Sequence, residues 1–420
     1  QGLESFSSRG EPFYIFPWGD MHFIGPTEDR VDSEPEGQRV LESDGLLSAD
    51  FHVHSGISFD SGLSARQRVT DFIAQGCEVL VPTEHNVLYD LGPTIAAMGL
   101  QDALFSFPGV EVTGMAPSAR TPRTIGHSNV FPVTPQPGEF MGGNVHFEGM
   151  RLGEAIAAYK ARFPQSLFQL NHPRSTVGDD DGAFFDHLSQ GASFQPQLAL
   201  SEQPNSLLLE QHPGSAYRDI DFDAIELLNG TDMPLYEQVR EDWFALLKAG
   251  VYKVATANSD SHKSHHIVAY PRNMLVMQED DPATVSSGQI MRAVRAGQLY
   301  GSTGPLLQID VDGTGPGGIH RGTSGTLSVR VDSAPWVEVD TLRIWLNGAL
   351  YKTLPVERGV PVAETLQIAG DGFVFVEALG PASAIYQAIV PGAIPFAFAN
   401  PVLLDAQGDG WNVEPASTAP

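Results

Sequence analysis

The chain has 420 residues, of which 42% are hydrophobic and 18% charged, a globular balance with room for about two or three domains. Its formal net charge of −27, from 51 acidic and 24 basic residues, opposes sequence-independent binding to nucleic acid. No apolar run is long enough to span a bilayer, so we expect no membrane insertion. The single cysteine, Cys77, excludes an intramolecular disulfide and a cysteine-based zinc site, and we expect a buried, inert thiol.

Residues 1–48 are rich in glycine, proline, serine and acidic residues, with one strand-like piece at 13–16 and an aromatic side chain at Trp18. This composition indicates an N-terminal extension or the remnant of a β module. The chain starts with Gln1 and not Met, as it would after removal of a signal segment or in a sequence that begins inside a longer precursor. We therefore favour an exported location, periplasmic or extracellular, over a cytoplasmic one.

Residues 49–304 alternate between strand-like and helical patterns. Helical patterns include 65–75, 152–163 and 235–248, and Gly76 and Gly250 stand where two of these helices should end. The strand-like runs are 49–53, 78–82, 107–112, 127–133, 166–170, 224–228 and 252–257. This alternation favours parallel βαβ units, and about seven strands favour a closed barrel.

After Pro305 the pattern changes to short strands separated by turn residues, and no good helix is visible. The predicted strands are 306–311, 326–331, 341–346, 373–378 and 396–404. The pair Asn347-Gly348 is typical of a tight hairpin. We therefore expect residues 305–420 to form a small all-β sandwich domain.

The chemically most informative stretch is Asp50-Phe51-His52-Val53-His54-Ser55, followed by Asp60. Side chains alternate across a strand, so His52 and His54 point the same way and can share one metal ion. A His-x-His at the carboxyl end of a strand is a common start of the metal site in β/α-barrel hydrolases.

Further metal-ligand side chains stand near the ends of most later strands. They are His85, Glu111, His127, His172, Asp260 and His262. The sixth strand, Glu226-Leu227-Leu228-Asn229-Gly230, offers no histidine. Imidazole and carboxylate donors suit divalent metals such as Zn, Mn and Fe.

The order of these nine residues resembles the polymerase and histidinol phosphatase (PHP) superfamily. That family's signature is a His-x-His, a downstream Asp or His, a His, a Glu, two further His and an Asp-x-His, and this chain supplies all of them. The resemblance implies a deformed (β/α)7 TIM-like barrel over residues 49–304 and an enzyme that cleaves ester bonds.

The resemblance also points to one branch of the superfamily. The spacing from His54 to Asp60 is one residue longer than in many members. The segment His-Ser-Gly-Ile-Ser-Phe-Asp-Ser, the Asn171-His172-Pro173-Arg174 motif and the trailing β region are similar to the branch that includes carbaryl hydrolases.

Three divalent transition metal ions are implied as cofactors, with Zn, Mn or Fe as candidates. Carried over, His52, His54, Glu111 and Asp260 would hold the first ion. Glu111 would bridge to a second ion held with His127 and His172. Asp60, His85 and His262 would hold the third. A water that bridges two such ions is acidic enough to act as a hydroxide nucleophile near neutral pH.

Four residues are candidates for a catalytic role: Glu111, Asp260, Arg174 and His265. Arg174 can clamp a phosphate or carboxylate, or it can form an ion pair that supports its loop. His265 can donate a proton to the leaving group, although a solvated loop is the alternative. Glu84, beside His85, is expected to orient a ligand. His22, His146, His187, His212 and His320 lack a ligand context and are interpreted as structural.

These features predict a metal-dependent hydrolase that acts on small phosphate mono- or diesters. A carboxylic or carbamate ester hydrolase on the same site is the close alternative. A non-catalytic metal- or carbohydrate-binding surface module is the alternative from another class, and a polymerase-associated exonuclease is weakened by the acidic charge. The expected partner is a small-molecule ester; the sequence leaves the oligomeric state open.

Overall fold

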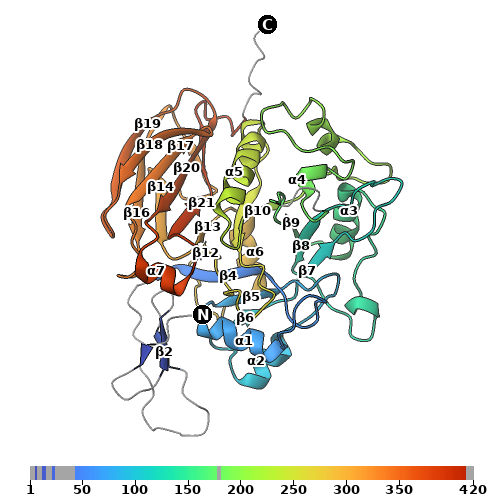
Figure 1. Cartoon of the computed structure of the whole chain (residues 1–420). Coiled ribbons are helices and arrows are strands. Elements are labelled where there is room, and N and C mark those ends of the chain that lie inside the picture. Colours follow the sequence, from blue (N-terminus) through green and yellow to red (C-terminus); the bar gives the residue numbers. More distant parts are fainter. Residues whose placement is uncertain (1–4, 7–11, 16–20, 24–42, 177–180, 413–420) are drawn as a thin grey trace.

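The computed structural model describes residues 5–6, 12–15, 21–23, 43–176 and 181–412 (Figure 1). Near the N-terminus, β1 (Ser5–Phe6), β2 (Pro12–Ile15) and β3 (Met21–Phe23) pair as a small antiparallel sheet. The strand expected at 13–16 corresponds to β2, whereas Trp18 and most of the predicted extension lie outside the described residues. Of the helices in these ranges, none has the length and apolarity that crossing a bilayer requires.

The largest sheet has eleven strands and combines strands from residues 46–106 with strands from residues 272–405. In spatial order, its main path contains β15 (Ile319–Arg321), β22 (Val402–Asp405), β20 (Gly372–Leu379), β21 (Phe396–Ala399), β13 (Leu299–Ser302), β12 (Arg272–Val276), β4 (Leu46–Val53), β5 (Val79–Pro82) and β6 (Phe105–Ser106). A branch adds β17 (Thr341–Leu346), which pairs with β20, and β18 (Ala349–Pro355). Only β4–β5–β6 and β15–β22 pair in parallel.

A second sheet has five strands. They are β11 (Val254–Asn258), β10 (Ala224–Asn229), β9 (Leu167–Leu170), β8 (His127–Phe131) and β7 (Val110–Thr113). The first three pair in parallel, but β8 runs antiparallel to both of its neighbours. The expectation that all of these strands are parallel is therefore wrong for β8. His127 begins this strand and does not follow it, and the reversed direction brings His127 to the same end as the other candidate ligands.

The two sheets meet at isolated bridges near the candidate ligands. His85 forms a parallel bridge with Glu111, and Val53 forms one with Ser261. The backbone N–H of Asp260 also donates to the carbonyl of His52 at 2.9 Å. The strand pairing thus gives a mixed α/β fold whose two sheets touch at this end, and it does not confirm the closed barrel that the alternation predicts.

Helices pack against these sheets, and α5 lies between the second sheet and the C-terminal strands β20 and β21 (Figure 1). They are α1 (Ala65–Ala74), α2 (Gly92–Met98), α3 (Leu152–Arg162), α4 (Phe184–His187), α5 (Met233–Lys248), α6 (Ser287–Arg295) and α7 (Ala384–Ile389), with 3-10 turns at Phe140–Gly142 and Asn205–Leu209. Helix α5 begins where Asp232 accepts a hydrogen bond from the N–H of Leu235, and α1 begins at Ser64 in the same way. Gly76 and Gly250 follow these helices with φ of 59° and 73°, as predicted.

The C-terminal residues are mostly strands, as expected, but they do not form an isolated sandwich. The strands β14 (Leu306–Val311), β16 (Ser324–Asp332) and β19 (Val362–Gln367) make a three-stranded antiparallel sheet. This sheet shares a hydrophobic core with β17 and β20, which are part of the eleven-stranded sheet. The hairpin β17–β18 turns at Asn347-Gly348 as predicted, whereas α7 was not expected in this region.

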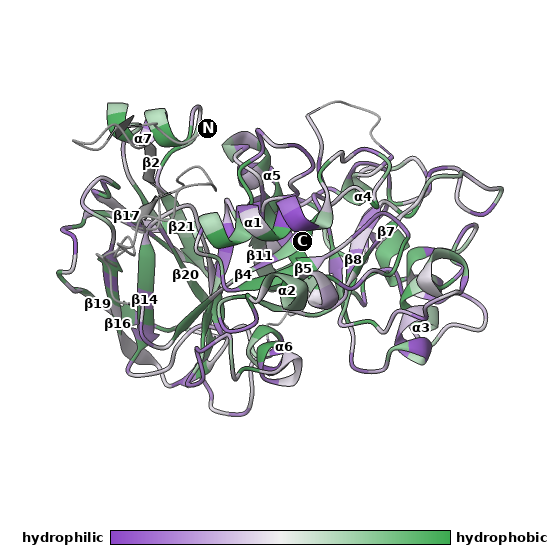
Figure 2. Cartoon of the chain, turned by 90° about the horizontal axis from the view of Figure 1, so that it is seen from below, coloured by the Kyte–Doolittle hydropathy of each residue, from purple (hydrophilic) through white to green (hydrophobic). Residues whose placement is uncertain are grey.

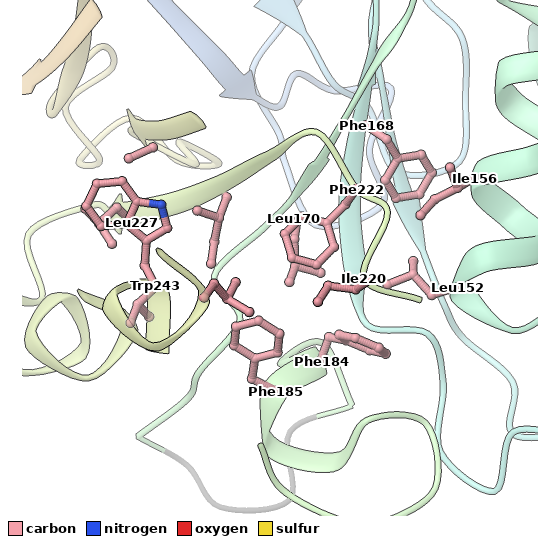
Figure 3. Packing of buried hydrophobic residues seen from close by; sticks show 14 of the residues in the cluster. Leu152, Ile156, Phe168, Leu170, Phe184, Phe185, Ile220, Phe222, Leu227 and Trp243 are labelled. Carbon is pink, nitrogen blue, oxygen red and sulfur yellow. The ribbon is translucent and has the colours of Figure 1, made fainter. Parts of the chain in front are cut away.

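Apolar packing holds the second sheet against α3 and α5. Figure 3 shows Leu152 and Ile156 of α3 beside Phe168 of β9, while Trp243 of α5 lies near Leu227 of β10. In Figure 2, many residues of the inner strands are coloured as hydrophobic, whereas α1 contains both hydrophobic and hydrophilic residues. Burial of large side chains on both sheet faces stabilises the strands and leaves their ends to carry polar groups.

Candidate metal centre

All nine predicted ligands converge at one end of the two sheets. We call this set the histidine–carboxylate cluster. It consists of His52 in β4, His54 and Asp60 after β4, His85 after β5, Glu111 in β7, His127 in β8, His172 after β9, and Asp260 and His262 after β11. They come from six strands or the loops that follow them, so the cluster exists only in the folded chain.

Glu111 is the central carboxylate of the cluster and is fully buried. Its Oε1 atom lies 3.2 Å from both His52 Nε2 and His127 Nδ1, and 3.6 Å from His172 Nε2. Its Oε2 atom lies 2.5 Å from His85 Nδ1. A carboxylate with two oxygen atoms turned toward different imidazoles has the arrangement that a bridging ligand needs.

Asp260 occupies the other side of His52. Its Oδ1 atom lies 3.2 Å from His52 Nε2 and 3.2 Å from His54 Nε2. These three atoms are buried and have no hydrogen-bond partner among the described residues. Unpaired buried polar atoms are costly, and here three of them face one another. The donor set therefore fits a metal ion, which would satisfy all three at once.

Three groups in the cluster place their donor atoms within 4.8 Å of one another. These groups are His52–His54–Asp260, His52–Glu111–His172 and His54–His85–His262. They overlap largely with the three expected ligand sets, but His52 and His54 are each shared between two groups. The cluster can hold metal, and this grouping leaves open how many ions it takes.

The loop residue Asp60 lies beside the third group. Asp60 Oδ2 lies 3.2 Å from His85 Nε2 and 3.1 Å from His262 Nε2. The ring of His54 stacks on those of His262 and His85, with centroids 4.0 Å and 4.4 Å apart. Asp60 is thus in the position expected from the sequence.

Glu226 is a buried residue that the sequence interpretation missed. Its Oε1 atom lies 3.0 Å from His52 Nδ1, and its Oε2 atom accepts the backbone N–H of His172 at 2.9 Å. Amide groups of Asn258 and Asn229 also donate to it, at 2.8 Å and 2.9 Å. A carboxylate behind a ligand imidazole fixes the orientation of the ring and leaves Nε2 facing the metal. A lone acidic residue inside the apolar strand Ala224–Asn229 was the available signal.

We expect Glu226→Gln to weaken metal binding by about 10- to 100-fold, because the amide cannot accept from all of these donors and carries no charge. Titration of the metal-free protein with Zn²⁺ measures the effect. Glu202→Gln, at an exposed position, is the matched control. Unchanged affinity in Glu226→Gln would show that the orientation of His52 does not depend on this carboxylate.

Glu84 supports the cluster in a similar way, as predicted. It is fully buried and accepts hydrogen bonds from Ser55 N at 3.0 Å and from Ser58 Oγ at 2.6 Å. Ser58 Oγ in turn lies 3.0 Å from His54 Nδ1 and accepts the N–H of His85 at 3.1 Å. One carboxylate therefore orders the loop that carries His54 and Asp60, and Ser58 links this loop to His85.

Arg68 joins the loop after β4 to the loop after β11. This buried α1 residue donates from Nε to the carbonyl of His54 at 2.8 Å and from Nη2 to the carbonyl of Ser261 at 2.9 Å. Ser261 lies between Asp260 and His262. The arginine thus holds two of the cluster's segments together, a role that a lysine cannot reproduce with one nitrogen.

Charge pairing within the cluster shifts several pKa values in the metal-free protein. Burial opposes ionisation of Glu111, but His127 and His52 hold its pKa well below the usual range. Burial lowers the pKa of His54 to about 4, so this ring offers a free lone pair at neutral pH. Burial also opposes protonation of His172, but Glu111 and Asp260 raise its pKa to about 9.

Two cluster residues adopt backbone conformations that are rare for their side chains. Asp260 has a φ of 48° and His172 a φ of 21°. Each such conformation costs on the order of 1–3 kcal/mol and persists only where the surrounding structure imposes it. Strain of this kind accompanies functional sites more often than ordinary loops.

Arg174 does not have the arrangement that binding an anion would need. Its Nε and Nη2 atoms donate to the two carboxylate oxygens of Asp242 at 2.7 Å and 2.8 Å. Its Nη1 atom donates to Asp186 at 3.0 Å and Ser193 at 2.8 Å, and Nη2 also donates to the carbonyl of Phe194. Each guanidinium nitrogen already has a protein acceptor, so the loop-supporting ion pair is the interpretation that holds.

His265 is also outside the cluster's contacts. It is exposed, and its described ring contact is with His266, at a centroid distance of 4.6 Å. His266 Nδ1 accepts the backbone N–H of His262 at 3.3 Å. Nothing among the described residues positions His265 to donate a proton at the cluster, so the solvated-loop alternative fits better.

The remaining histidines and the cysteine behave as structural residues. His212 pairs with Asp219 at 2.8 Å, and His320 lies 3.1 Å from the carbonyl of Ser324. His187 lies 3.1 Å from the carbonyl of Asp181, His146 is exposed, and the side chain of His22 is outside the described part. Cys77 is buried, and burial raises its pKa to about 12, so the thiol is inert as predicted.

A cavity of about 1000 Å³ lies away from the cluster, between α6 and β14. It is bordered by Leu46, the first residue of β4, whereas the cluster begins near the last residues of that strand. Its lining includes Val276, Arg292 and Leu307 but no cluster residue. Its size alone does not make it the reaction site.

No protein-family model matches the chain, and no curated protein sequence matches it. Among solved structures, the chain is similar to an amidohydrolase from Chromobacterium violaceum whose structure holds bound sulfate and no metal. The two chains are 15% identical, and the alignment covers 58% of this chain and 96% of the other with a TM-score of 0.34. Backbones that superpose this loosely carry no functional argument, and the functional evidence is therefore the histidine–carboxylate cluster itself.

Proposed function

We propose that the protein is a metal-dependent hydrolase that cleaves small esters at the histidine–carboxylate cluster. The observation that carries this proposal is the convergence of His52 Nε2, His54 Nε2 and Asp260 Oδ1, three buried atoms without hydrogen-bond partners among the described residues. A fold seldom buries such atoms together unless a cation completes the site.

The three donor groups identify the residues that would hold the metal ions. His52, His54 and Asp260 would hold one ion, and Glu111 with His172 would hold a second beside His127. His85 and His262, with Asp60, would hold a third. Bound divalent ions would supply Lewis acidity that polarises a substrate oxygen and lowers the pKa of water.

The protein's own residues would prepare this chemistry by orientation and exclusion of water. Glu226 fixes the ring of His52, and Glu84 orders the loop around His54. His127 and His172 are partly exposed, so they lie where the buried cluster opens to solvent.

The order of the nine ligand residues along the chain supports placement in the PHP superfamily, and the motifs around Asp60 and Arg174 support its carbaryl-hydrolase-like branch.

Phosphate mono- or diesters are the first substrate class, since most of the superfamily that the chain resembles acts on phosphoesters. Carboxylic or carbamate esters are the second candidate, and one observation favours them. The guanidinium of Arg174 is occupied by Asp242 and Asp186, so the predicted phosphate clamp is not available. A neutral ester needs no such clamp.

Metal analysis combined with an ester panel tests this proposal. We expect about three transition metal ions per chain after supplementation, and hydrolysis of p-nitrophenyl phosphate, bis-p-nitrophenyl phosphate or p-nitrophenyl acetate that a chelator abolishes and metal restores. His146→Ala, at an exposed position outside the cluster, is the control for substitution. Tight metal binding with no turnover of any ester would favour a binding module, and a stoichiometry near one would contradict the trinuclear site.

We expect metal affinity to increase as the pH rises from about 6 to 9. The pKa of His172 is about 9 and that of His52 lies well above its usual range, because carboxylates surround both rings. Both are therefore protonated in the metal-free protein at pH 7 and must release protons before a cation binds. Calorimetric Zn²⁺ titrations in buffers of different ionisation enthalpy measure the release; identical apparent enthalpies would contradict it.

A further inference from the structure

An exposed phenylalanine lies directly on the histidine–carboxylate cluster. Phe59 is 74% exposed, although it is flanked by two residues of the site's framework, Ser58 and Asp60. Ile57, in the same loop, is 43% exposed. A large apolar side chain left in solvent beside a candidate active site has lost hydrophobic stabilisation that a ligand can restore.

The ring of Phe59 has a defined position. It stacks on the ring of His85, with centroids 4.8 Å apart and planes inclined by 26°. His85 also stacks on His54, at 4.4 Å and 26°. Two rings cannot stack at these distances on one face, so Phe59 covers the face of His85 opposite to His54 and is the outermost ring of the column.

The loop on either side of Phe59 is anchored to the cluster. Ser58 Oγ accepts the backbone N–H of His85 at 3.1 Å, and Ser58 also donates to the buried carboxylate of Glu84. Asp60 Oδ2 lies 3.2 Å from His85 Nε2. Phe59 is thus held between two anchored residues, and its free face is presented at a fixed place beside the proposed metal ligands.

We propose that Phe59 is a specificity-determining residue that binds the flat apolar group of the substrate. This inference rests on the proposed function and narrows it to esters with an aromatic or similarly flat apolar substituent near the scissile bond. The two nitrogen atoms of His85 face Glu111 and Asp60, and one face of its ring is covered by Phe59. Phe59 is therefore the apolar surface that a substrate meets on this side of the site. The inference does not depend on whether the ester centre is phosphorus or carbon.

Binding of two small phosphonates to the zinc-loaded protein provides the first test, because neither requires turnover. Phenylphosphonate and methylphosphonate carry the same acid group and differ in the aromatic ring. We expect Phe59→Ala to weaken phenylphosphonate about 3- to 15-fold, the range of an aromatic pair, and to leave methylphosphonate unchanged. Phe59→Trp should retain the preference. Phe140→Ala, which removes a ring that is 85% exposed elsewhere, is the matched control and should alter neither ligand.

Steady-state kinetics provide the second readout, with p-nitrophenyl acetate and phenyl acetate compared with ethyl acetate. We expect Phe59→Ala to lower kcat/KM for the aryl esters by the same factor and not for the alkyl ester. Equal weakening of both phosphonates together with loss of zinc would show that Phe59 only shields His85, and would overturn the inference. An unchanged ratio between the two phosphonates would overturn it as well.

Ester hydrolysis and the binding role of Phe59 are tested by different results. If the wild-type protein binds phenylphosphonate in a Phe59-dependent manner but hydrolyses no ester, the binding role of Phe59 is supported and the proposed reaction is wrong. If esters are hydrolysed and Phe59→Ala affects aryl and alkyl substrates alike, the proposed reaction is supported and the binding role of Phe59 is wrong.

Discussion

Replacing Glu111 with glutamine is expected to lower kcat by at least about 100-fold, the scale seen when a principal electrostatic group is removed from an active site. The carboxylate lies within 3.2 Å of His52 and His127 and within 2.5 Å of His85, so its charge acts on several ligands together. Glutamine has nearly the same shape but no charge and only one oxygen. Two ions should therefore be weakened at once.

The measurement pairs metal content with turnover on the best ester of the panel. Glu237→Gln makes the same change at an exposed position of α5 and should behave as wild type. Circular dichroism should show an intact fold, because the backbone bridge between His85 and Glu111 does not involve the side chain. A Glu111→Gln variant with full metal content and near-normal turnover would show that Glu111 is an ordinary strand residue.

Replacing Arg174 with alanine is expected to destabilise the protein by about 3–5 kcal/mol, the cost of leaving one partner of a buried ion pair alone. Asp242 would then be buried without its guanidinium. Burial raises the pKa of Asp242 to about 6 even though Arg174 lowers it, so removing Arg174 should raise it further. The loss of stability should therefore shrink as the pH falls toward about 6, because Asp242 of the variant takes up its proton at a higher pH than Asp242 of the wild type and the unpaired charge is then removed.

Urea unfolding at pH 5 and pH 8 measures this effect. The variant Arg174→Met/Asp242→Leu removes both charges and should recover much of the lost stability, because an apolar pair can replace a buried ion pair. Kinetics separate the two roles of Arg174: a supporting ion pair predicts equal loss of kcat/KM for bis-p-nitrophenyl phosphate and p-nitrophenyl acetate. A selective increase in KM for the anionic ester would restore the anion-binding role.

Local sequence, together with the resemblance of the residue order to a known family, was sufficient to predict the residues that form the candidate metal centre. His52 and His54 are two residues apart on a strand, and alternation places them on one face whatever surrounds them. The remaining ligands follow or begin apolar runs, and runs such as 167–170 and 254–258 became strands close to the predicted bounds. Helix ends were equally predictable, because Gly76 and Gly250 supply the left-handed residue that a helix end requires.

Contacts between distant segments decided what the local sequence could not. The direction of β8 is defined by its antiparallel pairing with β7 and β9, which the apolar pattern of its own residues does not reveal. Glu226 could be identified as a supporting residue only once folding placed its side chain against that of His52, which is 174 positions away.

The role of Arg174 was likewise decided by a contact with a distant segment. Its position after His172 is compatible with either a substrate clamp or a supporting ion pair, and the choice depends on whether an acceptor lies within reach. That acceptor, Asp242, is 68 residues away on α5. The amino-acid sequence by itself determined which side chains are available as ligands and on which local face each stands. Only the tertiary structure decided which of the other charged side chains face the cluster and which are neutralised by a partner, because a charge's role depends on what folding places beside it.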